Sequence, residues 1–108
     1  MQHERVGTFR VEVPTTRRER MRGFRDRRSQ DPRGCMLFRR CRSVHTFGMA
    51  FPIDVVLLDA RQRPIRTVRL APNRMLLPKR RVRHVMEVVA GQGDALCEAL
   101  AARSVPAR

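Results

Sequence analysis

The sequence contains neither tryptophan nor tyrosine, and only one of its 24 basic residues is a lysine, Lys79. An aromatic stacking surface would therefore have to come from its five phenylalanines. No segment approaches the roughly 18 consecutive apolar residues that a membrane-spanning helix needs. The first residues, MQHERVGTFRVEV, also lack the apolar core that is typical of a signal peptide. We therefore expect a cytoplasmic protein with no membrane span.

The three cysteines, Cys35, Cys41 and Cys97, make an odd number, unlike the even set that is typical of a secreted disulfide scaffold. Cys35, Cys41 and His45 lie close together in the sequence, and His84 is a further candidate ligand. However, the sequence has no Cys-x-x-Cys pair, which favours incidental thiols over a zinc site. We predict no metal site and no cofactor. Cys41 and His45 also lack a signature of nucleophilic catalysis.

Acidic residues are scarce, because 10 of them face 24 basic residues and leave a formal net charge of +14. Such a charge attracts polyanions through the release of counterions, although an arginine-rich composition is also typical of a genome with biased codon usage. One alternative function is therefore a basic, nucleic-acid-associated protein. Its candidate contact residues form two clusters: Arg17, Arg18, Arg25 and Arg28, then Lys79, Arg80, Arg81 and Arg83.

The longest stretch with few charges is His45–Asp59, HTFGMAFPIDVVLLD. Within it, Ile53–Leu58 is almost entirely apolar and β-branched at three of six positions. A run this short predicts a strand that is buried on both faces of a sheet. The rest of the chain is expected to pack around this strand.

Alternation of apolar and polar residues predicts a half-buried strand over Val6–Val13, with Phe9, Val11 and Val13 on one side. Further strands are expected at Cys35–Phe38, Thr46–Met49, Ile65–Leu70 and Val82–Ala90, with a long loop at Ala71–Arg81.

Two short helices are expected. Thr16 and Glu19 form a capping-box pattern before a helix at Arg17–Phe24, with Met21 and Phe24 on its inward face. A C-terminal helix would be capped by Asp94, with Leu96 and Leu100 facing inward.

Six short strands and two short helices predict a single domain over residues 1–108 of the α+β, β-rich class. The expected architecture is a small antiparallel barrel or a curled sheet, with the helices at its ends. A chain of this length would have a radius of gyration of about 13 Å.

Asp54 opens the central strand, so its carboxyl group needs a partner. It would pair with an arginine such as Arg22, or it would accept N–H groups at a helix start. A functional alternative places Arg22, His45, Met49 and Asp54 around a pocket for a small polar or anionic ligand. The first hypothesis is thus a non-enzymatic domain with a modest ligand pocket, in which Asp54→Ala costs stability more than binding. An enzyme acting through Asp54 and His45 is a third alternative.

The order of motifs resembles domain-of-unknown-function family 192, over roughly Val11 to Leu100. The segments that carry the resemblance are Thr16, Glu19, Arg20, Arg22, Gly23 and Phe24, then GCMLF at 34–38, HTFGM at 45–49, PIDV at 52–55, Leu58-Asp59 and VMEVVAG at 85–91.

The resemblance implies a compact β-rich domain with two helices, and it implies no activity, because the family has no established function. This chain differs from the family pattern at Phe24, where leucine is usual, and at Ala50-Phe51, where many members have lysine and asparagine. Its C-terminal residues also lack the closing turn and strand of many members.

Overall fold

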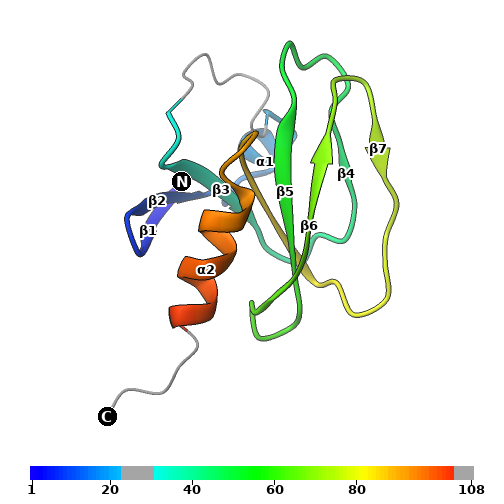
Figure 1. Ribbon diagram of the computed structural model, residues 1–108. Coiled ribbons are helices and arrows are strands. Elements are labelled where there is room, and N and C mark those ends of the chain that lie inside the picture. The colour runs from blue at the N-terminus through cyan, green and yellow to red at the C-terminus, as the bar shows by residue number, and fades with distance from the viewer. Residues whose placement is uncertain (23–30, 104–108) are drawn as a thin grey trace.

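The computed structural model describes residues 1–22 and 31–103. Its main element is a six-stranded sheet in the order β1-β2-β3-β8-β5-β6, accompanied by a two-stranded sheet of β4 and β7 and by two helices (Figure 1). The radius of gyration is 12.9 Å. The strands are β1 Gln2–Val6, β2 Phe9–Val13, β3 Gly34–Phe38, β4 Val44–His45, β5 Ile53–Leu58, β6 Pro64–Leu70, β7 Met75–Leu76 and β8 His84–Val89, and the helices are α1 Arg17–Arg22 and α2 Gly93–Arg103.

The six-stranded sheet is open, because β1 and β6 are its two edges and do not pair with each other within the described residues. All neighbouring strands are antiparallel except β2 and β3, which are parallel and are connected through α1. The expected α+β, β-rich fold is therefore confirmed in its curled-sheet form. The closed barrel that the strand spacing also allowed does not form.

β5 is the most deeply buried strand, as its composition predicts. Every residue of Ile53–Leu58 is buried, and the strand pairs with β8 on one side and with β6 on the other. Its side chains alternate between two apolar clusters. Val56 and Leu58 pack in the cluster under α2, whereas Val55 and Leu57 pack in the cluster on the opposite face of the sheet.

The single strand expected at Val6–Val13 is in fact the second half of a β-hairpin. β1 and β2 pair in register around a turn at Gly7 and Thr8. Gly7 has a φ of +58°, which favours glycine, and a Cβ atom there would lie 3.2 Å from that of Ala99 in α2. The alternation that the sequence shows therefore starts only after this turn, at Phe9.

The strand expected at Thr46–Met49 lies two residues earlier, at Val44–His45. Thr46 ends it, because its hydroxyl group donates to the carbonyl of Ala71 at 2.6 Å and accepts from the N–H of Arg74 at 2.8 Å. The expected loop at 71–81 is likewise interrupted by β7, which pairs with β4. Neither two-residue strand has a periodicity that sequence patterning can detect.

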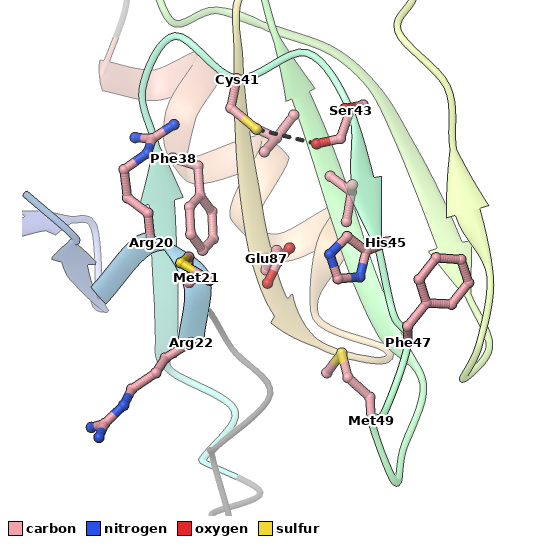
Figure 2. A pocket seen from close by; sticks show the side chains of 12 residues that line it. Arg20, Met21, Arg22, Phe38, Cys41, Ser43, His45, Phe47, Met49 and Glu87 are labelled. Atoms are coloured by element: carbon pink, nitrogen blue, oxygen red, sulfur yellow. Dashed lines mark hydrogen bonds between the residues drawn. The ribbon is translucent and has the colours of Figure 1, made fainter. Parts of the chain in front are cut away.

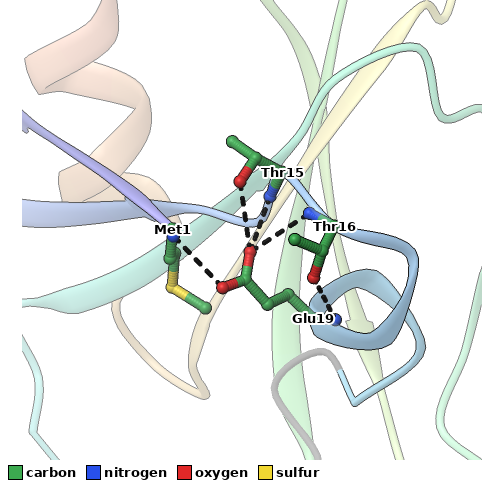
Figure 3. A network of polar contacts seen from close by, with 4 residues as sticks. All are labelled: Met1, Thr15, Thr16 and Glu19. Carbon is green, nitrogen blue, oxygen red and sulfur yellow. Dashed lines mark hydrogen bonds and ion pairs between the residues drawn. The ribbon is translucent and has the colours of Figure 1, made fainter.

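The helix α1 begins where the capping box predicts. The Thr16 hydroxyl accepts from the N–H of Glu19 at 3.1 Å, and the Glu19 carboxylate accepts from the N–H groups of Thr15 and Thr16 at 2.9 and 3.2 Å (Figure 3). The other Glu19 oxygen lies 3.1 Å from the amino group of Met1. However, α1 contains no buried residue, and Met21, expected to face inward, is 70% exposed.

In α2, Leu96 and Leu100 are buried against the sheet as expected. Asp94 is exposed in the first turn, whereas the carboxylate that accepts hydrogen bonds at the helix start belongs to Asp54 of β5. The prediction that Asp94 caps the helix is therefore wrong, because a residue distant in sequence supplies the acceptor. Phe24, Arg25 and Arg28 lie outside the described residues.

Candidate functional site

Asp54 braces the α2 face of the sheet. One of its carboxylate oxygens accepts from Arg69 at 2.9 Å, and the other accepts from the N–H groups of Gly91 and Gly93, both at 2.9 Å. Burial raises the pKa of this carboxyl group, but the hydrogen bonds from Arg69, Gly93 and Gly91 outweigh burial and lower it. Asp54 thus combines both expected structural roles, with Arg69 as its arginine partner in place of Arg22.

The opposite face of the sheet contains a cavity of about 200 Å³ (Figure 2). Its walls come from α1, the end of β3, the β3–β4 connection, β4 and the segment that follows it, and β8. The lining residues are Arg20, Met21, Arg22, Phe38, Cys41, Ser43, Val44, His45, Phe47, Met49, Val85 and Glu87.

The pairing of β4 with β7 and a set of turn hydrogen bonds hold the outer wall of the cavity. The N–H of Thr46 donates to the carbonyl of Arg74 at 2.8 Å, and the N–H of Met49 donates to the carbonyl of Thr46 at 3.1 Å. The N–H of Gly48, whose φ is +79°, donates to the Asn73 side chain at 3.1 Å. This small sheet and its turn therefore fix the backbone from which the wall's side chains project.

Two aromatic rings stand at the cavity mouth. His45 and Phe47 stack with their ring centroids 5.0 Å apart and an angle of 21° between the ring planes. Phe47 is 45% exposed, although phenylalanine is usually buried. The pair offers a partly exposed apolar surface beside the cationic side chains of Arg20 and Arg22.

The interior of the cavity combines apolar side chains with an acid and a thiol. Glu87 of β8 lines the cavity and is only 8% exposed, between Met86 and Val88 in sequence. Cys41 donates to the carbonyl of Ser43 at 3.1 Å, and burial raises the pKa of its thiol. A thiol with a raised pKa stays protonated near neutral pH and is a poor nucleophile.

The structure therefore brings together three of the four residues of the hypothesised ligand pocket. Arg22, His45 and Met49 line the cavity, whereas Asp54 lies on the α2 face with its carboxylate fully engaged. An enzyme that pairs Asp54 with His45 is not supported by this geometry, because the sheet separates the two side chains. Sequence reasoning missed Glu87, although an acid inside an apolar strand is the signal that had identified Asp54.

Comparison with known proteins places this geometry in a family. The model of domain-of-unknown-function family 192 (DUF192), described as an "Uncharacterized ACR", matches residues 1–97. This chain belongs to that family. No protein of curated function matches it.

Two solved structures share the DUF192 chain's fold. A protein of unknown function from Novosphingobium aromaticivorans DSM 12444 has a TM-score of 0.69 and 20% identity, with 82% of this chain and 68% of that chain covered. A protein from Sinorhizobium meliloti 1021 described as a "putative transcription regulator" has a TM-score of 0.67 and 23% identity, with 82% and 74% covered. At these identities the likeness shows the fold alone.

The two predicted basic clusters of the DUF192 chain lie in different places. Arg17 and Arg18 line an open groove along α1, whereas Arg81 and Arg83 line a separate depression of about 270 Å³ with the β5–β6 turn residues Asp59, Ala60, Arg61 and Arg63. Neither Lys79 nor Arg80 is among the described residues that line these depressions. The two clusters therefore do not merge into one groove.

Two further searches of the DUF192 structure found nothing. Among residues 1–22 and 31–103, no three histidine, cysteine or acidic side chains are grouped closely enough to hold a metal ion. Neither α1 nor α2, the helices of the described chain, has the length and apolar character needed to cross a membrane.

Proposed function

We propose that this domain binds a small organic anion in the cavity beside α1, and that it does so without catalysing a reaction. The observation that carries the proposal is the meeting of cationic and apolar side chains around one cavity. Arg20 and Arg22 stand on one side of the mouth, and the stacked pair of His45 and Phe47 stands on the other. Most small-molecule sites combine an apolar lining with a few convergent polar groups in this way.

The size of the cavity limits the ligand. A volume of about 200 Å³ is below the 300 to 1,000 Å³ that is typical of sites for drug-sized ligands. We therefore infer a compact ligand, with one planar or apolar part inside the cavity and its anionic group at the arginines. A binding role fits these side chains better than catalysis, because the Cys41 thiol is held protonated and Asp54 belongs to the other face.

The protein's methionines provide a direct test. Met49 lines the cavity, whereas Met86 is buried in the cluster under α2, so methyl NMR of methionine-labelled protein reports on both faces at once. We expect nucleoside monophosphates or aromatic carboxylates to shift the Met49 methyl signal saturably and to leave Met86 unchanged. Inorganic phosphate alone should have little effect on Met49, because it has no part that fills the apolar cavity.

His45→Ala should weaken this binding at least several-fold, because it removes half of the stacked pair. Arg61→Ala is the matched control, since it removes a charge from the separate depression beside the β5–β6 turn. The proposal fails if no organic anion at millimolar concentration shifts Met49, or if His45→Ala and Arg61→Ala weaken binding equally.

A further inference from the structure

The cavity opens into a basic groove that continues along α1. Arg20, Met21, Arg22 and His45 line both the cavity and the groove, and Arg17 and Arg18 extend the groove to the start of the helix. A ligand in the cavity thus has a path out over the helix surface. At a rise of about 1.5 Å per residue, Arg17 and Arg22 are separated by about 8 Å along the helix axis, enough for more than one anionic group.

The groove is positively charged throughout. Four arginines and His45 line it together with Met21, and no carboxylate is among these described lining residues. The one acid of α1, Glu19, is instead bound to the N–H groups of Thr15 and Thr16 at the helix start (Figure 3). The acid of the helix therefore does not line the groove, and an extended anion would meet only positive charge there.

The exposed apolar side chains lie where the groove meets the cavity. Met21 is 70% exposed, and Phe47, stacked on His45, is 45% exposed. Aromatic side chains next to a cationic groove are the combination with which proteins bind single-stranded nucleic acids, because each base presents a flat face for stacking. A base held in a duplex is not available for such contact.

We propose that the occupant of this joined surface is a single-stranded nucleic acid, with one base in the cavity and the adjacent phosphates on Arg17, Arg18, Arg20 and Arg22. The inference rests on the proposed function, because it identifies the small anion in the cavity as one nucleotide of a longer strand. Arginine suits this role, since its planar guanidinium group binds phosphate through two parallel hydrogen bonds.

Glu87 gives the cavity a preference among bases. Its carboxylate lies among the lining residues and accepts hydrogen bonds, and an ionised carboxylate has about four acceptor positions. Cytosine presents an exocyclic amino group, which carboxylates accept from, whereas thymine presents a carbonyl oxygen at that position. A strand of cytosines should therefore bind more tightly than a strand of thymines of equal length and charge.

The experiment measures fluorescence anisotropy of labelled dC8, dT8 and a mixed-sequence duplex at pH 7.5 and increasing salt. We expect dC8 to bind at least threefold more tightly than dT8, and both to bind more tightly than the duplex per site. The affinity should fall with salt, because each phosphate contact on a single strand contributes a slope of about −0.7 in a plot of log K against log salt.

Variants separate the two parts of the surface. Arg17→Ala/Arg18→Ala should weaken dC8 and dT8 alike by about tenfold and reduce the salt slope by one to two contacts' worth, about 0.7 each. Glu87→Gln should keep the salt slope and abolish the preference for dC8. If Glu87→Gln does not fold, Phe47→Ala, at an exposed position, provides the second variant and should weaken binding of both strands at least threefold.

The matched control is Arg5→Ala/Arg66→Ala, which removes the same charge from two exposed arginines outside the groove. Equal weakening by this control would overturn the proposal in favour of a general charge effect, as would equal binding of an octaglutamate peptide. Free organic anions that shift Met49 while dC8 does not compete would reject this inference and leave the proposed function standing. Failure of both probes would reject both.

Discussion

The two faces of the six-stranded sheet are built differently. On the α2 face, apolar side chains from five strands of the sheet and from the helix form a closed cluster, and the one buried acid, Asp54, has an arginine and two N–H groups as partners. On the opposite face, β4, β7 and α1 leave a cavity with exposed apolar side chains at its mouth. A long helix with a regular apolar stripe covers a sheet fully, whereas a six-residue helix without buried residues does not.

This difference indicates how the domain divides its roles. A face that is closed and satisfied contributes stability, and substitutions there should unfold the protein. A face that exposes Phe47 and Met21 gives up burial, which costs free energy unless a ligand covers them. The four predictions below test that division.

The largest contrast should come from one substitution made on both faces. Phe9 is 1% exposed in the cluster under α2, whereas Phe47 is 45% exposed at the cavity mouth. Phe9→Ala should lower the free energy of unfolding by about 3 to 5 kcal/mol, and Phe47→Ala by less than about 1 kcal/mol, as measured by urea denaturation. Similar losses for the two variants would mean that the cavity face is as tightly packed as the other.

Asp54→Ala should be the next largest effect. It leaves the buried N–H of Gly93 without its acceptor and removes the carboxylate at the start of α2. We expect a loss of about 2 to 3 kcal/mol, the sum of a charge-assisted hydrogen bond and a helix cap. The methyl shift of Met49 on ligand binding should persist. Loss of binding in a fully folded Asp54→Ala protein would contradict the assignment of this residue to the structural face.

Gly93→Ala tests how closely α2 approaches the sheet. A Cβ atom at this position would lie 2.4 Å from the Thr67 methyl carbon and 2.9 Å from an Asp54 carboxylate oxygen. We expect a loss of about 1 to 3 kcal/mol from overpacking. Thr67→Ser removes the nearest atom, so the double variant should recover part of that loss in thermal denaturation. A double variant no more stable than Gly93→Ala would place the strain elsewhere.

The smallest effect concerns acid. Backbone hydrogen bonds from Thr15 and Thr16 lower the pKa of Glu19 to about 2. Because the folded pKa is lowered, the stabilising contribution is complete above the unfolded value of about 4.3 and is lost as the pH falls through about 2. The amide signal of Thr16 should titrate with a midpoint near pH 2 in NMR spectra and should not titrate in Glu19→Gln. A midpoint above pH 4 would show that the capping box is not populated.

Several elements were predictable because their signals are local. The apolar run at Ile53–Leu58 predicts a buried strand wherever it lies, since no other element buries six consecutive residues on both faces of a sheet. The capping box at Thr16 and Glu19 predicts the start of α1, because its hydrogen bonds join residues three apart. The turn at Gly7 and the two-residue strands escaped prediction, because their conformations depend on partners elsewhere.

The candidate site was predictable only in part. Arg22, His45 and Met49 were selected as residue types and by resemblance, and the structure places them around one cavity. Asp54 was selected on the same grounds and lies on the other face, because strand alternation assigns its side chain to the α2 side with Val56 and Leu58. Glu87 was overlooked because nothing in the sequence says which strand will be the neighbour of β3 and β5.

The sequence by itself determined the family, the β-rich class, the central strand, the start of α1 and the strong positive charge. These follow from composition, from alternation over a few residues and from motifs that need no distant partner. The tertiary structure alone decided which arginine pairs with Asp54, which carboxylate serves the start of α2, and which side chains share the cavity. Each of these depends on strand order, and strand order is set by the burial of whole faces, which no short stretch of sequence contains.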